Sequence, residues 1–329
     1  MSMIYFEDES DLSLLSQQTV GVIGYGELAQ ALALNMRDSG VHVLVSAHSP
    51  DESDAAESHQ LPLASASVVA QRAHILVLAL PDETLPQVYM ESISPHLARG
   101  YTLVFTSAYT VTFGFIEPPP FVDVGLVSPR ATGISTRANY LSGAGTSSVV
   151  AVGQDASRAA WGTVLAVAGA CGALRAGAVE VNFEQEAQLT LFVQQALIPV
   201  FHHLMVTAAD VLMRSGFSAE AALPDLYLSG KFQAYLAQTA QTGLLNAIQA
   251  STQTGQYATL SRLSRFNDLK LERLLEVTLD EIRAGDFARE WAREYADGGQ
   301  RLNKLNKAQA ALDLWEWEQQ TLELLARRF

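Results

Sequence analysis

The stretch Val20–Ala31, VGVIGYGELAQA, decides the fold of this chain of 329 residues. It reads as an apolar strand that ends in Gly24-Tyr25-Gly26, followed at once by a helix with Ala29 at the third small position. Gly24 permits the tight turn, Gly26 lets the backbone approach a pyrophosphate, and Ala29 allows the helix to pack closely on the strand. The N–H groups and positive dipole end of the helix favour phosphate. We predict a dinucleotide site, with a merely structural turn as the alternative, formed by Gly24, Tyr25, Gly26, Glu27, Leu28 and Ala29.

The rest of the chain indicates two domains. The first half alternates helix-like stretches with short strands that are apolar almost throughout, which is typical of a parallel sheet covered on both faces. These strands are expected at residues 19–24, 41–46, 74–81, 102–108, 122–129 and 147–152. From Phe183 onward the pattern is helical, with no convincing strand. We predict an α/β Rossmann domain over residues 1–182, followed by an all-α domain over residues 183–329.

Composition excludes several classes of protein. The net charge of -14 argues against nucleic acid, and an anionic ligand needs a local positive site against that field. The single cysteine, Cys171, lies among small residues and reads as a buried, inert thiol. The N-terminal MSMIYFEDESDL lacks the apolar run of a signal peptide, and runs such as ILVLAL are too short to span a bilayer. We predict a cytoplasmic protein with no nucleic-acid or membrane partner.

The end of the second strand bears on the choice of cofactor. NAD-binding proteins usually place an acid there to bind the ribose 2′-hydroxyl. Here Ser46, His48 and Ser49 occupy that place and suit a 2′-phosphate, so NADPH is the predicted cofactor. Asp51 and Glu52 add negative charge just beyond, which keeps NADH as the alternative.

With these segments in place, the chain resembles the ketol-acid reductoisomerases. The resemblance begins with VIGYGELAQALALNMRDSGVHVLV and continues in order through LPDETLPQVYMESISPHLARG, FGFIEPPPFVDVGLVSPRATG, ALRAGAVEVNF and EIRAGDFAREW. It implies a Rossmann domain and a knotted helical domain whose dimer interface builds the active site, and hence a homodimer. It also implies three further cofactor-binding residues, Leu80, Pro81 and Asp82.

The chain departs from this family at the positions that the resemblance assigns to catalysis. Two histidines are replaced by Ser107 and Thr112, a lysine by Arg130, and substrate-binding Ser and Glu by Ala250 and Gln256. Where the resemblance implies carboxylate ligands of two Mg²⁺ ions, the chain has Thr190, Gln194, Asp225 and Ser229. Because Mg²⁺ requires hard, charged oxygen ligands, we predict no metal site and do not expect isomeroreductase activity.

A nicotinamide site without a metal suits an easily protonated acceptor such as a C=N bond. We therefore predict a metal-independent NADPH-dependent imine reductase, acting on a free or carrier-bound thiazoline as in siderophore-type biosynthesis. A metal-free ketone or 2-ketoacid reductase is one alternative, and a non-catalytic cofactor-binding homologue is another.

The proposed proton donors are Tyr109, Ser107 and Asp225. Tyr109 follows the strand end that faces the nicotinamide in the resembled family, although a packed aromatic ring is the alternative. Asp225 has a raised pKa if its pocket is apolar, although it also suits a helix N-cap. Further candidates are Tyr227, His202 and His203, and for the two histidines a surface position is the alternative.

Overall fold

The computed structural model describes residues 2–267 and 270–326, and the chain divides between Leu189 and Thr190 into two compact units. The first unit is an α/β domain built on one sheet of eight strands. The second unit is helical throughout its described residues. The predicted fold class is confirmed. The two units divide within helix α8 (Phe183–Phe192).

The sheet of the first unit is mixed, not parallel as the sequence predicted. Parallel pairs join β3 to β2, β2 to β4, β4 to β5, β5 to β6 and β7 to β8, whereas β7 runs antiparallel to β6 and β1 antiparallel to β8. An apolar run reports burial on both faces but not strand direction, so the reversal at β7 left no mark in the sequence pattern. The strands are β1 (Ile4–Tyr5), β2 (Thr19–Ile23), β3 (His42–Ser46), β4 (Ile75–Leu78), β5 (Thr102–Phe105), β6 (Asp123–Pro129), β7 (Ser148–Gln154) and β8 (Ala178–Glu180).

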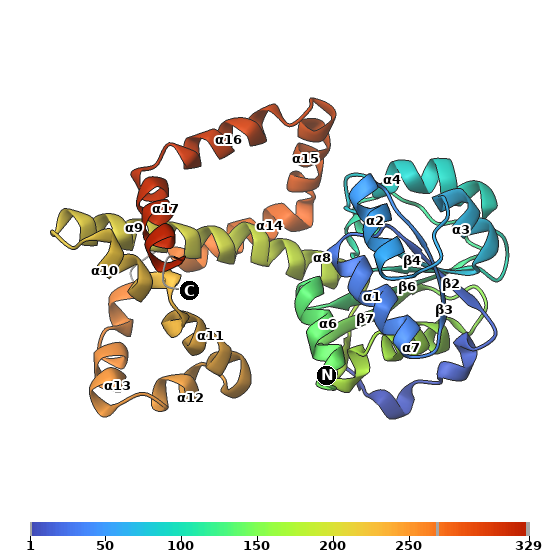
Figure 1. Cartoon of the computed structure of the whole chain (residues 1–329), viewed down its shortest axis with the longest axis horizontal. Coiled ribbons are helices and arrows are strands. Elements are labelled where there is room, and N and C mark those ends of the chain that lie inside the picture. The colour runs from blue at the N-terminus through green and yellow to red at the C-terminus, as the bar shows by residue number, and fades with distance from the viewer. Residues whose placement is uncertain (1, 268–269, 327–329) are drawn as a thin grey trace. The chain divides into compact units, whose positions relative to one another are not determined.

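Alternate residues of the central strands point to opposite faces of the sheet, as the pleat requires. Val20 and Val22 of β2 join a core with helices α1 (Glu27–Asp38) and α7 (Ala160–Ala170). Leu76 and Leu78 of β4 join a second core on the other face, with α3 (Ala66–Arg72) and η3 (Tyr89–Ile93). Figure 1 shows these helices covering the two faces of the sheet.

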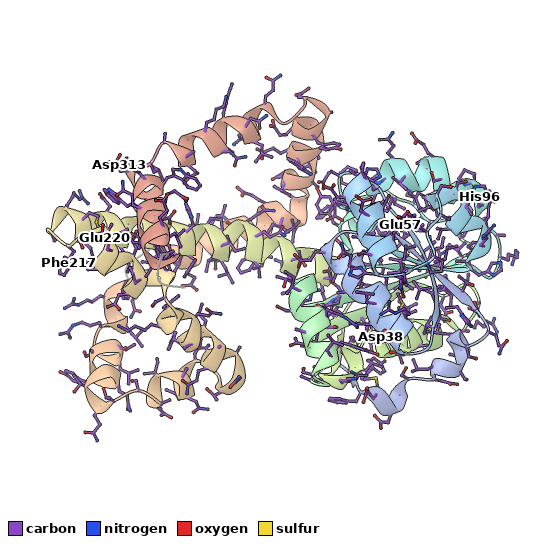
Figure 2. The ribbon with its side chains drawn as sticks, viewed as in Figure 1. Asp38, Glu57, His96, Phe217, Glu220 and Asp313 are labelled. Atoms are coloured by element: carbon purple, nitrogen blue, oxygen red, sulfur yellow. The ribbon has the colours of Figure 1, made fainter. Side chains whose placement is uncertain are left out.

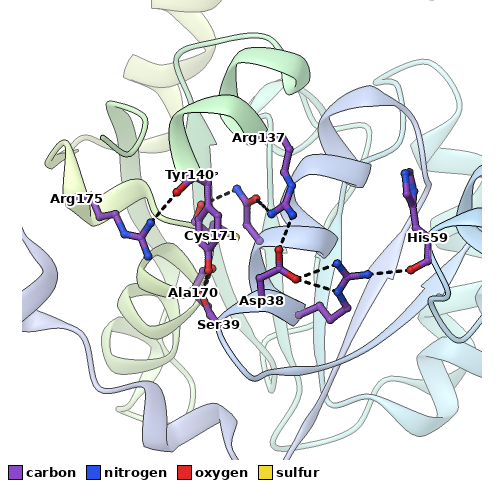
Figure 3. A network of polar contacts seen from close by, with 10 residues as sticks. Asp38, Ser39, His59, Arg137, Tyr140, Ala170, Cys171 and Arg175 are labelled. Atoms are coloured by element: carbon purple, nitrogen blue, oxygen red, sulfur yellow. Dashed lines mark hydrogen bonds and ion pairs between the residues drawn. The ribbon is translucent and has the colours of Figure 1, made fainter. Parts of the chain in front are cut away.

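A polar network fixes α1 to its neighbours (Figure 3). Asp38, near the end of α1, pairs with Arg37 and with Arg137 of α6 (Gly133–Leu141). Arg137 also donates to Asn35 Oδ1 at 2.8 Å, and Asn35 Nδ2 donates to the carbonyl of Cys171 at 3.0 Å. The Cys171 thiol is buried, which raises its pKa to about 12 and agrees with the prediction of an inert residue. The network holds in place the helix that begins at the glycine loop.

Five neighbouring strands of the first unit end at one edge of the sheet. Because β3, β2, β4, β5 and β6 are mutually parallel, their carboxyl ends lie side by side. The segments that follow them are therefore neighbours, and open α/β sheets bind their ligands at this edge. These segments include Gly24–Gly26, Leu80–Asp82, Ser107–Tyr109 and Arg130.

The second unit buries few large side chains. Only Leu223 and Ile282 among its large apolar residues are fully buried in the part that the structure describes, whereas Leu197, Phe201 and Leu204 are exposed. Its helices are α9 (Ile198–Arg214), α10 (Ala219–Leu223), η7 (Pro224–Leu228), α11 (Gly230–Thr242), α12 (Leu244–Gln249), α13 (Gln253–Leu260), α14 (Leu271–Ala284), α15 (Asp286–Ala296), α16 (Gln300–Ala310) and α17 (Asp313–Ala326).

One helix is longer and more apolar than the sequence pattern indicated. Among the described residues, Phe183–Arg214 form one continuous helix of 32 residues. By its length and composition alone, this helix could cross a membrane. The sequence prediction missed this length because Gln, Thr and His side chains interrupt the apolar run. This is weak evidence for a membrane span, since helices of soluble proteins pass the same test.

Candidate functional site

The glycine loop after β2 has the geometry of a dinucleotide cradle. Gly24 has φ +95°, and a Cβ there would lie 2.9 Å from Leu80 Cδ2 and 3.0 Å from the carbonyl oxygen of Ala79. At Gly26 the backbone is extended, and the nearest atom to a Cβ would be Glu52 Oε1 at 3.8 Å. Helix α1 begins directly after Gly26 without a side-chain cap, so its first N–H groups suit an anion. These residues fit a pyrophosphate.

The other residues predicted for this loop have mixed roles. Ala29 is 1% exposed and allows α1 to lie close to the sheet. The Tyr25 ring is fully buried, its hydroxyl hydrogen-bonds His59 Nδ1 at 3.0 Å, and burial raises its pKa to about 12. Glu27 accepts a hydrogen bond from the Ile134 N–H at 3.1 Å, so its carboxylate is engaged by α6. Tyr25 and Ala29 therefore shape the loop by packing.

A carboxylate that the sequence prediction placed outside the site lies inside it. Glu52 Oε2 accepts hydrogen bonds from Tyr25 N–H at 3.0 Å and from His48 N–H at 2.7 Å. Ser49 caps α2 (Pro50–Ser58) by accepting from Glu52 N–H at 3.3 Å. A Ser followed three residues later by Glu is a capping-box pattern, in which the Glu side chain folds back over the helix start. That pattern was the available signal for Glu52.

The residues predicted to hold a 2′-phosphate are therefore not an open basic pocket. Ser46 is 2% exposed, and its Oγ accepts from Gly24 N–H at 3.4 Å. Ser49 is engaged as the cap, and His48 is exposed. Helix α2 carries only acids among its charged residues, namely Asp51, Glu52, Asp54 and Glu57.

Further along the same sheet edge, an acid and a hydroxyl form a pair. Ser107, after β5, donates from Oγ to Oδ2 of Asp82, after β4, at 3.2 Å. The Tyr109 N–H donates to Ser107 Oγ at 3.3 Å. Burial raises the pKa of Asp82 to about 6; the hydrogen bond from Ser107 opposes this, and the charges of Glu186 and Glu83 add to it. The structure thus joins a residue predicted for catalysis to one predicted for the cofactor.

A buried glutamate accepts hydrogen bonds from residues near the ends of β5 and β6. Glu186 of α8 is 2% exposed and accepts hydrogen bonds from Ala108 N–H at 2.9 Å and Ser128 Oγ at 3.1 Å. Arg130, after β6, pairs with it at 2.8 Å and remains 32% exposed. The sequence prediction missed Glu186, although its spacing from Phe183 puts it on the apolar face of its helix.

The other predicted proton donors lie in different surroundings. Tyr109 is 7% exposed and stacks on Phe115 with ring centroids 5.7 Å apart, while its hydroxyl has no hydrogen-bond partner among the described residues. Burial raises its pKa to about 12, with a smaller contribution from the charges of Asp82 and Glu83. The packed-aromatic alternative thus describes Tyr109 well.

The remaining donors belong to the second unit. His202 and His203 are exposed, and His202 Nε2 lies 3.1 Å from Gln309 Oε1. Tyr227 donates to Glu318, and burial raises the pKa of this tyrosine strongly. Neither histidine lies in a buried cluster of ionisable groups.

The positions that the resemblance assigns to metal ligands carry weak donors. Asp225 is 71% exposed and pairs with Lys231 at 3.1 Å, so it does not occupy the apolar pocket expected from the sequence. Ser229 accepts from Lys231 N–H at 3.4 Å, and Thr190 and Gln194 offer a hydroxyl and an amide. Within residues 2–267 and 270–326, no three His, Cys, Asp or Glu side chains gather to hold a metal. Because Mg²⁺ takes charged oxygen ligands, these residues do not fit a pair of Mg²⁺ ions.

Comparison with known proteins gives this geometry a family. The model of the NADPH-binding domain of acetohydroxy acid isomeroreductases matches residues 14–177, and that of the ketol-acid reductoisomerase C-terminal domain matches residues 183–326. This chain belongs to the ketol-acid reductoisomerase family.

Individual relatives match along nearly the whole chain. The ketol-acid reductoisomerase (NADP(+)) of Methanopyrus kandleri is 36% identical over 303 residues, covering 91% of this chain and 90% of its own. That of Pyrobaculum aerophilum is 33% identical over 307 residues, covering 93% of each chain. The solved structure of an NADH-preferring ketol-acid reductoisomerase from an uncultured archaean matches with a TM-score of 0.92 at 26% identity, covering 98% of this chain and 99% of that one.

These relatives overturn the predicted function. The prediction of an imine reductase acting on a free or carrier-bound thiazoline in siderophore-type biosynthesis is wrong, because relatives that match 91–93% of the chain are named ketol-acid reductoisomerases. Those names point to ketol-acid isomerisation and reduction, which we did not expect from the substituted ligand positions. They give no support to a non-catalytic homologue.

Proposed function

We propose that this protein is a nicotinamide-dependent oxidoreductase that reduces the ketone of a small ketol acid. The observation that carries the proposal is the common sheet edge, where the glycine loop, the Asp82–Ser107 pair and Arg130 follow neighbouring parallel strands. A bound nicotinamide cofactor supplies hydride to the ketone carbon. The protein must then hold the substrate and provide a proton to its oxygen.

Specific residues suit each of these tasks. Gly24, Gly26 and the first turn of α1 hold the pyrophosphate of the cofactor. Arg130, whose side chain is 32% exposed, offers guanidinium N–H groups to the substrate carboxylate, while Glu186 balances its charge. Its guanidinium is oriented by Glu186 and keeps a third of its surface open. Ser107 carries the hydroxyl that hydrogen-bonds Asp82, the acid of the pair, and this hydroxyl suits the task of providing a proton.

The described residues at the implied ligand positions do not fit a pair of Mg²⁺ ions, and the proposed reduction requires none. The test is oxidation of NADPH, followed by absorbance, with two substrates in the presence of either Mg²⁺ or EDTA. A 3-hydroxy-2-oxo acid needs only hydride and a proton, whereas an acetohydroxy acid needs an alkyl migration first. We expect the 3-hydroxy-2-oxo acid to be reduced in EDTA.

The other outcomes are informative in different ways. Reduction of the acetohydroxy acid that depends on Mg²⁺ would extend the function to the isomerisation and contradict our reading of the ligand positions. If cofactor binds tightly and neither substrate is reduced, the proposed substrate class is wrong.

We propose NADPH as the cofactor, since the names of the relatives include NADP(+). We also propose that Glu52 limits the preference for NADPH over NADH. The end of the second strand of a Rossmann motif, here β3, receives the adenosine ribose. A carboxylate hydrogen-bonded to His48 N–H therefore lies near any 2′-phosphate and repels it.

Replacing Glu52 with glutamine is expected to shift the ratio of the dissociation constants for NADH and NADPH about tenfold toward NADPH, or about 1.4 kcal/mol. Fluorescence titration of both cofactors measures this ratio. The matched control is Glu57→Gln, on the exposed part of the same helix (Figure 2), which makes the same change of charge and should alter the ratio by less than about twofold. Equal effects of the two variants would contradict a specific role for Glu52.

We also propose that the protein is a cytoplasmic homodimer. Its cofactor and substrate are small, water-soluble molecules. The second unit leaves Leu197, Phe201, Leu204 and Val211 of its longest helix region exposed, an apolar surface that a second copy would cover. Sedimentation that gave the mass of one 35.5 kDa chain at micromolar concentration would remove this proposal.

A further inference from the structure

The pair formed by Asp82 and Ser107 has a geometry that exceeds what cofactor binding requires. The two residues follow adjacent parallel strands, β4 and β5, and their oxygens lie 3.2 Å apart. Both side chains are half-buried, so each keeps a route to the open edge of the sheet. We propose that Ser107 is the catalytic proton donor to the substrate oxygen and that Asp82 supplies its proton through Ser107. This inference rests on the proposed reduction.

The surroundings of Asp82 favour its protonated form. Burial is the largest cause that raises its pKa to about 6, and the negative charges of Glu186 and Glu83 act in the same direction. Of the other ionisable groups nearby, Tyr109 is buried and stays neutral, and Arg130 is bound by Glu186. A carboxyl group in these surroundings is a working acid at slightly acidic to neutral pH.

The hydrogen bonds around Ser107 allow it to pass a proton on. With Asp82 ionised, the Ser107 hydroxyl donates to the carboxylate and is turned away from a substrate. With Asp82 protonated, the carboxyl O–H donates to Ser107 Oγ, and the hydroxyl hydrogen of Ser107 is released toward the substrate. The Tyr109 N–H, at 3.3 Å, holds the oxygen of Ser107 in place in both states.

The reduction balances with these groups. The ketone carbon gains a hydride with its two electrons, and the C=O π pair moves onto oxygen. That oxygen takes the proton of Ser107, and Ser107 takes the proton of Asp82. Asp82 is left as a carboxylate and recovers a proton from water, so one hydride and one proton are consumed in each turnover.

The first test needs neither cofactor nor substrate. Carbon-13 NMR of the side-chain carboxyl groups of the full-length protein should show Asp82 titrating near pH 6. Ser107→Ala should move this midpoint upward, because the hydrogen bond that stabilises the carboxylate is lost. Glu186→Gln should move it downward, because a nearby negative charge is removed. A midpoint for Asp82 in the ordinary range of aspartate would overturn the proposed transfer of a proton from Asp82 through Ser107, which we call the relay.

The second test is kinetic. Asp82→Asn and Ser107→Ala should each lower kcat at least 100-fold, the contribution typical of a general acid, with KM changed less than about threefold. Wild-type kcat should fall as pH rises above the Asp82 midpoint, because the acid is then ionised, and Asp82→Asn should lose this dependence. Ser107→Thr, which keeps the hydroxyl, should recover part of the rate.

Controls separate the relay from folding and from the proposed function. Asp82→Asn should not lower Tm, because a neutral amide replaces a poorly solvated charge. Glu91→Gln, which removes one charge from an exposed residue of η3, should keep kcat within about twofold at pH 6. If the wild type reduces a ketol acid and Asp82→Asn does so equally well, the relay is wrong and the function stands. If the wild type reduces none, the proposed function fails, and the relay fails with it whatever midpoint the NMR gives.

Discussion

Replacing Glu186 with alanine is expected to lower the free energy of unfolding of the first unit by about 3 kcal/mol. The carboxylate is 2% exposed and accepts hydrogen bonds from the Ala108 N–H and from Ser128, besides pairing with Arg130. Its removal leaves a buried N–H group and a hydroxyl without their acceptor. We place the loss at the lower end of the range for broken buried pairs because Arg130 is 32% exposed and keeps access to water. Denaturant unfolding followed by circular dichroism measures the change.

Two variants act as controls for this prediction. Glu186→Gln keeps the shape and an acceptor oxygen, so we expect it to cost about half as much as alanine. Glu184→Ala removes an exposed glutamate from the same helix and should change the stability by less than about 0.5 kcal/mol. If Glu186→Ala cost no more than Glu184→Ala, the buried cluster would not stabilise the unit.

Much of the fold followed from local patterns in the sequence. The run Val20–Ala31 combines an apolar strand, a glycine turn and a helix start, and the structure has β2, a turn at Gly24 with φ +95°, and α1 at those places. The errors concern strand direction and short strands. The two residues of β1 and the three of β8 are too short to give a pattern, and their pairing depends on contacts between distant parts of the chain.

The candidate site was less predictable, because its main groups act over long separations in the sequence. The sequence predicts roles for both Asp82 and Ser107, one in cofactor binding and one in catalysis, but only the pairing of β4 with β5 brings them together. The sequence pattern places Glu52 just beyond the site, whereas the first turn of α2 folds its carboxylate back to Tyr25 and His48. A hydrogen bond between residues 25 and 52 has no local signature except the capping box.

The error in function has a chemical origin. Substitutions such as Thr190 and Gln194 indicate which ligands are missing, and this bears on the chemistry of the metal. They carry no information about the acceptor of the hydride, so they do not distinguish a C=N bond from a ketone. The family match and the relatives at 31–36% identity supply that missing information, by pointing to ketol acids rather than imines.

Replacing Gly26 with valine should lower the affinity for NADPH at least 100-fold, or about 2.7 kcal/mol, without unfolding the protein. The backbone at Gly26 is extended, and the nearest atom to an added Cβ is Glu52 Oε1 at 3.8 Å, so a Cβ fits in the absence of cofactor. It then occupies the space through which a pyrophosphate approaches the start of α1. Fluorescence titration with NADPH gives the affinity, and thermal unfolding should give a Tm within about 2 °C of the wild type.

The matched variant is Gly24→Ala, which tests the fold instead of the ligand space. Its Cβ would lie 2.9 Å from Leu80 Cδ2 and 3.0 Å from a carbonyl oxygen, at a φ of +95° that disfavours side chains. We expect a loss of about 2 kcal/mol in the free energy of unfolding together with weaker binding. The two variants therefore separate cofactor binding from stability. Gly26→Val should lose the cofactor and keep its Tm, whereas Gly24→Ala should lose stability. If Gly26→Val bound NADPH as tightly as the wild type, the pyrophosphate would not lie at this loop, and the proposed reductase would lose its main support.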